Sequence, residues 1–201
     1  MDGQFGLKCG VAPGFWFDIF AGYQISSDQL QFIPSPGFSE GYFGNLPTAI
    51  PGIDTKKFFA GVNLKYSYQN FLDINLKGKY NSWKGTYNDR WFNTEDIDKD
   101  VEHVYNQPKM ELQASVSVKP IDKLAIDVNY YLGTDRYTCL GATGDVKMNN
   151  INELNLQTSY NFNKTFGVYA KASNLLNQKY EIYWGYPNQG INIMGGVNIN
   201  F

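Results

Sequence analysis

The stretch FFAGVNLKYSYQNFLDINLKGKY, residues 58–80, decides the fold class of this chain. Apolar or small residues occupy every second position on both sides of Gln69 and Asn70, and mostly polar residues stand between them. Alternation with a period of two is typical of a β-strand that has one apolar and one polar face. The stretch therefore predicts a hairpin whose strands, 58–68 and 72–80, are joined by a turn at 69–70.

The same alternation recurs along the rest of the sequence. It predicts three more hairpins and a last strand, over 5–25, 110–132, 154–172 and 191–201. Their turns fall at 12–14, 119–123 and 163–164, whereas long segments connect the hairpins at 26–55, 84–107, 133–150 and 174–190. Short and long connections alternate in this way when an up-and-down antiparallel sheet has its tight turns at one end. We expect an all-β chain of about nine strands.

The composition agrees with β structure and disfavours several classes of function. The 201 residues are 43% hydrophobic and 16% aromatic, which suits a single domain over 1–201. A formal net charge of −2 provides no general cationic surface for nucleic acid. The chain has one histidine, His103, so a Ser-His-Asp triad would have to use that residue. Cys9 and Cys139 are too far apart for a CxxC metal knuckle. We therefore expect no enzyme, metal site or cofactor.

The length of the alternating faces indicates their surroundings. They run about nine to eleven residues, as a tilted transmembrane strand requires, whereas globular strands average about five or six. Tyr and Phe gather at the strand ends, at Tyr66, Tyr68, Tyr80, Tyr130, Tyr160, Phe162, Phe166 and Phe201. Such rings match the interfacial girdles of membrane barrels. We expect an up-and-down antiparallel transmembrane β-barrel portion with short periplasmic turns and long extracellular loops. A soluble ligand-binding β-barrel, with the apolar faces inside, is the alternative.

Charged residues define the expected interior of such a barrel. A lysine that faces lipid near the midplane costs roughly 2–4 kcal/mol, so charged side chains belong on the lumen side. The expected lumen residues are Lys65, Lys77, Lys79, Lys171, Asp73, Asp127, Glu111 and Glu153. A lumen wall of such mixed charge is either wet or covered by a plug.

The C-terminal residues resemble a known family. The stretch ASNLLNQKY, residues 172–180, is followed by Gly185-Tyr186-Pro187, by Gly190 and by a last strand that ends on an aromatic residue. This succession resembles the C-terminus of TonB-dependent outer-membrane receptors. The resemblance implies that the last strand closes the barrel and carries the signal read by the outer-membrane assembly machinery, on Ile193, Val197, Ile199 and Phe201.

The resemblance also implies that most of a receptor is missing from this chain. Barrels of the family have roughly 22 strands around a plugged lumen. With the turn at 12–14 in the periplasm, the first strand begins on the extracellular side of the membrane. No export signal follows Met1. We therefore expect the C-terminal part of a receptor in the outer membrane of a Gram-negative bacterium. Its partners are outer-membrane lipid and the missing N-terminal strands and plug, from the same or another chain.

The implied function is the uptake of a scarce nutrient, namely a siderophore, haem, a vitamin or a glycan. A self-contained small outer-membrane barrel that acts as an adhesin, anchor or passive pore is a second alternative. Aromatic residues of the long loops are candidate ligand contacts, since their rings can stack on a ligand. These candidates are Trp91, Phe92, Tyr183, Trp184 and Tyr186.

The loop at 84–107 also contains a weak calcium-like pattern. Asp96, Asp98 and Asp100 are spaced like the first ligands of an EF-hand loop. Val101 stands where that loop requires glycine, and Gln107 stands where it requires the bidentate glutamate. We therefore expect a solvated acidic loop and no metal site.

Overall fold

The computed structural model describes residues 2–29, 52–88, 98–101, 103, 105–139 and 145–199. Their secondary structure is β throughout, and no helix among them is long and apolar enough to cross a membrane. The strands are β1 (Asp2–Ala12), β2 (Phe15–Gln29), β3 (Gly52–Tyr68), β4 (Leu72–Asn88), β5 (Asp98–Val101), β6 (Met110–Ile121), β7 (Leu124–Thr134), β8 (Arg136–Cys139), β9 (Asp145–Met148), β10 (Ile151–Asn161), β11 (Phe166–Ser173), β12 (Glu181–Tyr183), β13 (Tyr186–Pro187) and β14 (Asn192–Ile199).

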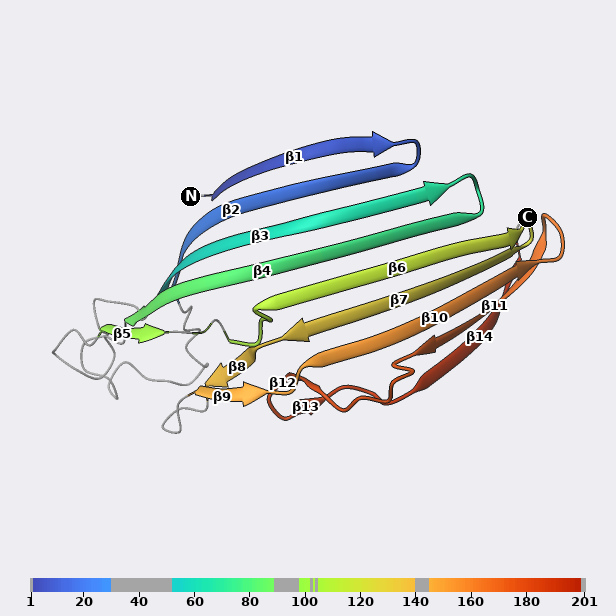
Figure 1. Ribbon diagram of the computed structural model, residues 1–201. Coiled ribbons are helices and arrows are strands. Elements are labelled where there is room, and N and C mark those ends of the chain that lie inside the picture. Colours follow the sequence, from blue (N-terminus) through green and yellow to red (C-terminus); the bar gives the residue numbers. More distant parts are fainter. Residues whose placement is uncertain are drawn as a thin grey trace.

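The large strands form one antiparallel up-and-down sheet in the order β1-β2-β3-β4-β6-β7-β10-β11-β14, and β5 adds to β4. Each strand of this path pairs with the next strand of the path along the chain, so the predicted all-β, up-and-down antiparallel class is confirmed. In Figure 1 the tight turns lie together at one end of the sheet, and the short strands β5, β8, β9, β12 and β13 lie at the other. We call these the turn end and the loop end. β1 starts at the loop end, and β14 runs to the turn end.

The strand bounds correct several predicted loops. β2 continues to Gln29, β3 begins at Gly52 and β4 continues to Asn88. The pairing therefore extends well into the segments predicted as loops at 26–55 and 84–107. Backbone ladders do not require apolar side chains, and therefore the alternation ends before the strands do. The other long connections contain the small sheets β8-β9 and β12-β13. The turn predicted at 119–123 is shorter, because β6 continues to Ile121 through a register shift around Pro120.

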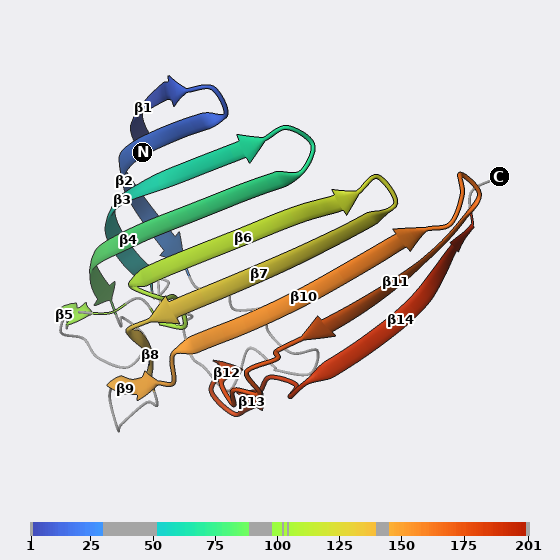
Figure 2. The same cartoon turned by 45° about the vertical axis from the view of Figure 1, so that its right-hand side comes forward.

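Successive cross-strand pairs give the sheet two different faces. Cys9, Phe17, Leu64, Leu76, Ala114, Tyr130 and Leu154 form one row, which is apolar. The next row, on the other face, is Lys8, Asp18, Asn63, Lys77, Gln113, Tyr131 and Glu153. The register places all eight predicted lumen residues on this polar face. Figure 2 shows the sheet as a single curved layer.

This single layer buries few side chains. Among the described residues only Phe20, Met148 and Tyr180 are buried hydrophobics. Leu7, Ile19 and Ile193 on the apolar face are 54%, 52% and 77% exposed. Domains normally bury an apolar sheet face against another layer, so this face requires an apolar environment that the described residues do not supply.

Aromatic rings on the polar face lie over cross-strand glycines. Phe20 pairs with Gly61, and Phe59 pairs with Gly22, on neighbouring β2 and β3. A Cβ at Gly61 would lie 2.4 Å from Phe20 Cζ, and one at Gly22 would lie 2.3 Å from Phe59 Cζ. The two rings are 6.4 Å apart between centroids. Glycine is required at both positions, because any side chain would displace the ring that covers it.

Candidate functional site

The polar face is hollowed along much of its width. A hollow of about 740 Å³ extends from β1 to β10. Charged and amide side chains line it, among them Lys8, Asp18, Lys65, Lys77 and Asn155. Seven strands of the path line this one hollow, so the polar face is the concave face of the sheet. The charged residues therefore lie on the concave face and the apolar row lies on the convex face.

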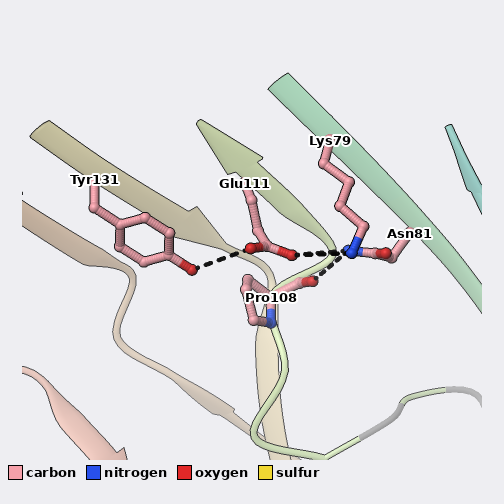
Figure 3. A network of polar contacts seen from close by, with 5 residues as sticks. All are labelled: Lys79, Asn81, Pro108, Glu111 and Tyr131. Carbon is pink, nitrogen blue, oxygen red and sulfur yellow. Dashed lines mark hydrogen bonds and ion pairs between the residues drawn. The ribbon is translucent and has the colours of Figure 1, made fainter. Parts of the chain in front are cut away.

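A polar network lies toward the loop end of the concave face, where β4, β6 and β7 meet (Figure 3). Glu111 is its centre: its Oε1 accepts a 3.2 Å hydrogen bond from Asn81 Nδ2 and lies 3.9 Å from Lys79 Nζ. Its Oε2 lies 3.5 Å from the hydroxyl of Tyr131, and Asn81 Nδ2 also donates to Pro108 O at 3.2 Å. Asn81 is only 1% exposed. The Glu111 carboxylate thus connects three strands, and Asn81 holds the loop before β6 against β4.

Lysines and aromatic rings form a second cluster on the same face. Lys57 and Trp83 are direct cross-strand partners of β3 and β4, and Lys57 Nζ lies 4.1 Å from the centroid of the Trp83 ring. Lys79 Nζ lies 5.5 Å from the centroid of Phe59. Such cation–π contacts are favourable and keep each ammonium on the concave side.

The segment 174–180, which carries the family resemblance, is a compact hydrogen-bonded turn. Asn174 and Asn177 both have positive φ, at 51° and 49°. Asn174 is 1% exposed, and its Nδ2 donates to Gln178 O at 3.1 Å and to Gln189 O at 2.9 Å. Its Oδ1 accepts from Gln178 N at 3.1 Å. Asparagine suits both needs of the site, because it tolerates the left-handed region and its amide satisfies buried backbone groups.

Tyr180 and Arg136 anchor the segment that follows. The hydroxyl of Tyr180 donates to Glu153 Oε2 on β10 at 2.5 Å. Burial and this hydrogen bond raise the pKa of Tyr180, so its phenol stays neutral. Arg136 on β8 is 1% exposed and donates from Nη1 to Glu181 O at 2.8 Å and from Nη2 to Ile182 O at 2.7 Å. Burial lowers the pKa of Arg136, but a guanidinium remains charged in proteins. β12 is thereby attached to the loop-end sheet β8-β9.

The β12-β13 hairpin displays three of the predicted ligand contacts. Tyr183 pairs with Tyr186 across a tight turn in which Gly185 has a φ of 81°. Tyr183, Trp184 and Tyr186 are 58%, 47% and 71% exposed. They form a small aromatic surface on an anchored hairpin. Trp91 and Phe92, the other two predicted contacts, lie outside the described residues. Ligand binding by this surface stays a prediction.

The predicted closing strand corresponds to β14. Ile193, Val197 and Ile199 lie on its apolar face and are 77%, 55% and 55% exposed. Among the described strands β14 pairs only with β11, and β1 pairs only with β2. Both edges of the described sheet are therefore open to a further strand. Phe201 lies outside the described residues.

Sequence reasoning missed Arg136 and the ring-over-glycine pairs. Arg136 bonds to carbonyl groups 45 and 46 residues away, and no local pattern indicates such a contact. A weak signal was present, because Arg136 is one of two arginines in the chain. His103, the one histidine, stacks on Tyr137 with 3.7 Å between ring centroids. Among the described residues no cluster of three metal-ligating side chains occurs.

Comparison with known proteins identifies the class of the fold. No protein-family model and no curated protein matches the chain. Solved structures do match, and they are TonB-dependent receptors, as the C-terminal residues indicated. At these low identities the likeness concerns the fold alone.

Two of the matching structures are of the receptor FpvA. The complex of FpvAI with pyocin S2 aligns at a TM-score of 0.70 with 11% identity. Pseudomonas aeruginosa FpvA bound to a heterologous ferric pyoverdine aligns at 0.64 with 12% identity. The ferric-catecholate import receptor Fiu of Escherichia coli K12 aligns at 0.45, too low to support an argument. This chain is covered completely by both FpvA alignments but spans only 26% and 27% of those chains.

Proposed function

We propose that this chain is the C-terminal barrel portion of a TonB-dependent receptor that takes up a scarce nutrient through the outer membrane of a Gram-negative bacterium. The observation that carries the proposal is the alignment of the whole chain with FpvA at a TM-score of 0.70. The nine-strand path and its one-sided tight turns support it. The proposed role is transport and not chemistry on a substrate.

The two faces of the sheet support a position in a membrane. Lipid would cover the convex face, which carries exposed apolar side chains from Leu7 on β1 to Ile193 on β14. The concave face, with its lysines and carboxylates, would look into the barrel, where charge avoids the cost of contact with lipid. The girdle residues Tyr68, Phe162 and Phe166 at the turn end are 50%, 48% and 39% exposed. Rings at this position suit the periplasmic interface.

The open edges support an incomplete barrel. In lipid an unpaired strand edge leaves backbone groups without partners, each at a cost of several kcal/mol. β1 and β14 each have one such edge in the described sheet. We propose that strands from the remainder of a longer receptor pair with both edges, since the chain matches only about a quarter of FpvA. A plug would then lie against the polar hollow.

The nutrient is proposed by class. FpvA is bound to a ferric pyoverdine in one of the matching structures, so a ferric siderophore is the first candidate for this receptor. Haem, a vitamin and a glycan remain the other candidates. The aromatic hairpin at 181–187, together with Trp91 and Phe92, is the proposed extracellular contact region.

The test measures uptake by cells that carry or lack the complete gene. Radiolabelled ferric siderophore, haem, cobalamin and oligosaccharide are offered in turn, with and without a protonophore. We expect accumulation of one label that requires the gene and stops with the protonophore. Gene-dependent uptake that ignores the protonophore would support a passive pore instead. Recovery of the protein in the soluble fraction would support a soluble barrel.

A further inference from the structure

The apolar face has a hollow of its own near the loop end. Its volume is about 590 Å³, and its lining includes Ala60, Val62, Gly78, Tyr80, Met110 and Leu132. The hollow exists because Gly78 stands in a row between Val62 and Leu112, where its neighbours carry branched side chains. A Cβ at Gly78 would have Val62 Cγ1 as its nearest neighbour, at 3.8 Å. This surface can accept a hydrocarbon chain.

Lysines lie between this hollow and the loop end. Lys109 Nζ lies 5.8 Å from the ring centroid of Tyr80, which is part of the hollow's lining. Farther along the same face, Lys56 and Lys84 are direct cross-strand partners, and both are exposed. No hydrogen bond or ion pair joins either ammonium to another described residue. Like charges directly opposite each other destabilise a sheet, so an anion between them would be bound favourably.

The register places the lysine pair on the loop-end side of the hollow. Gly78 and Lys84 are six residues apart on β4, which corresponds to about 20 Å along the strand. Lys56, Lys84 and Lys109 therefore form a basic band between the apolar hollow and the loop end of the same face.

We propose that this surface binds a bilayer amphiphile with a phosphorylated headgroup. One acyl chain would lie in the Gly78 hollow, and phosphate oxygens would accept hydrogen bonds from Lys109 and from the Lys56–Lys84 pair. The inference rests on the proposed function, because the surface meets such an amphiphile only if the convex face contacts the outer leaflet. A phosphorylated lipid fits better than an acidic protein, since the apolar hollow and the basic band are continuous on a face that requires apolar cover.

The test uses the complete protein in phosphatidylcholine nanodiscs that contain either lipid A, a bisphosphorylated acylated disaccharide, or no anionic lipid. Native mass spectrometry counts the lipid A molecules that remain on the protein after release from the disc. The variants are Lys56→Gln with Lys84→Gln, and Gly78→Leu. The matched control is Lys119→Gln with Lys164→Gln, which removes the same charge from exposed positions at the turn end.

We expect the Lys56/Lys84 variant to bind lipid A about 25-fold more weakly, since one lysine near an anionic surface contributes about fivefold. Gly78→Leu should also weaken binding, and the turn-end control should bind as the unmodified protein does. Equal retention by the Lys56/Lys84 variant and the unmodified protein would overturn the inference, and so would equal losses in the control. Displacement of lipid A by inorganic phosphate alone would contradict a role for the hollow. Failure to enter phosphatidylcholine discs would instead contradict the proposed function.

Discussion

Replacement of Asn174 by alanine should release the turn that precedes β12. The substitution removes the two hydrogen bonds from Nδ2 and the one accepted by Oδ1, in a site that is only 1% exposed. Each contributes about 1 kcal/mol. Alanine at a φ of 51° adds roughly 1 kcal/mol of strain, because its Cβ crowds the carbonyl in the left-handed region. The expected loss of local stability is therefore about 4 kcal/mol.

Hydrogen exchange of the complete protein in detergent measures this loss. The amide of Gln178 donates to Asn174 Oδ1, and its protection against exchange should fall several hundredfold in Asn174→Ala, on the order of 4 kcal/mol. Asn174→Gly relieves the strain but not the lost bonds, so its protection should fall about a hundredfold. Asn177→Gly is the control, since Asn177 has a similar φ of 49° but is exposed. Unchanged protection in Asn174→Ala, or full protection in Asn174→Gly, would refute the assigned role of the amide.

Three further results are expected. Gly61→Ala should destabilise the folded protein by about 1–3 kcal/mol in guanidinium titrations, since its Cβ would overlap a covering ring, whereas Gly78→Ala should be neutral because its Cβ has space. Leu76→Arg on the convex face should make insertion into bilayers less favourable by roughly 2–4 kcal/mol. Asn75→Arg, on the concave face, should insert as well as the unmodified protein does, and equal losses in both variants would contradict a membrane position. The raised pKa of Tyr180 means that the folded segment favours the neutral phenol, so docking should hold below pH 10.0 and weaken as pH rises further. Tyr180→Phe should lose this alkaline transition in tryptophan fluorescence, and a transition that persists in the variant would assign it to another group.

The sequence predicted the central sheet because its determinants are local. Alternation over 58–68 and 72–80 specifies both faces of a hairpin whose partners are adjacent in the chain, and the register of β3 with β4 follows from the turn between them. The C-terminal resemblance rested on residues such as Asn174 and Tyr180, which the structure shows as buried hydrogen-bonding groups. A short motif can therefore identify a fold when some of its side chains make specific buried hydrogen bonds.

Features that depend on distant pairing were not predictable. The extension of β3 and β4 passes through Lys56 and Lys57, where the apolar alternation has ended but the ladder continues. The place of Phe20 over Gly61 depends on a register that joins two strands across a long connection. Arg136 acts through carbonyl groups of β12, and a carbonyl group has no sequence signature. Glu111 likewise contacts Asn81 on β4 and Tyr131 on β7, and only the folded sheet brings these residues together.

The unequal connections between the strands have a consequence for the order of folding. The tight connection after β1 has two residues, 13–14, whereas the next one, 30–51, has 22. The longer loop costs about 2 kcal/mol more in closure entropy. Hairpins form in about 1–10 μs, so each should acquire its register before it docks on its neighbour. Residues 30–51 could then change in length while every strand pairing is retained, and pulse-labelling of variants with longer connections should detect the same early hairpins.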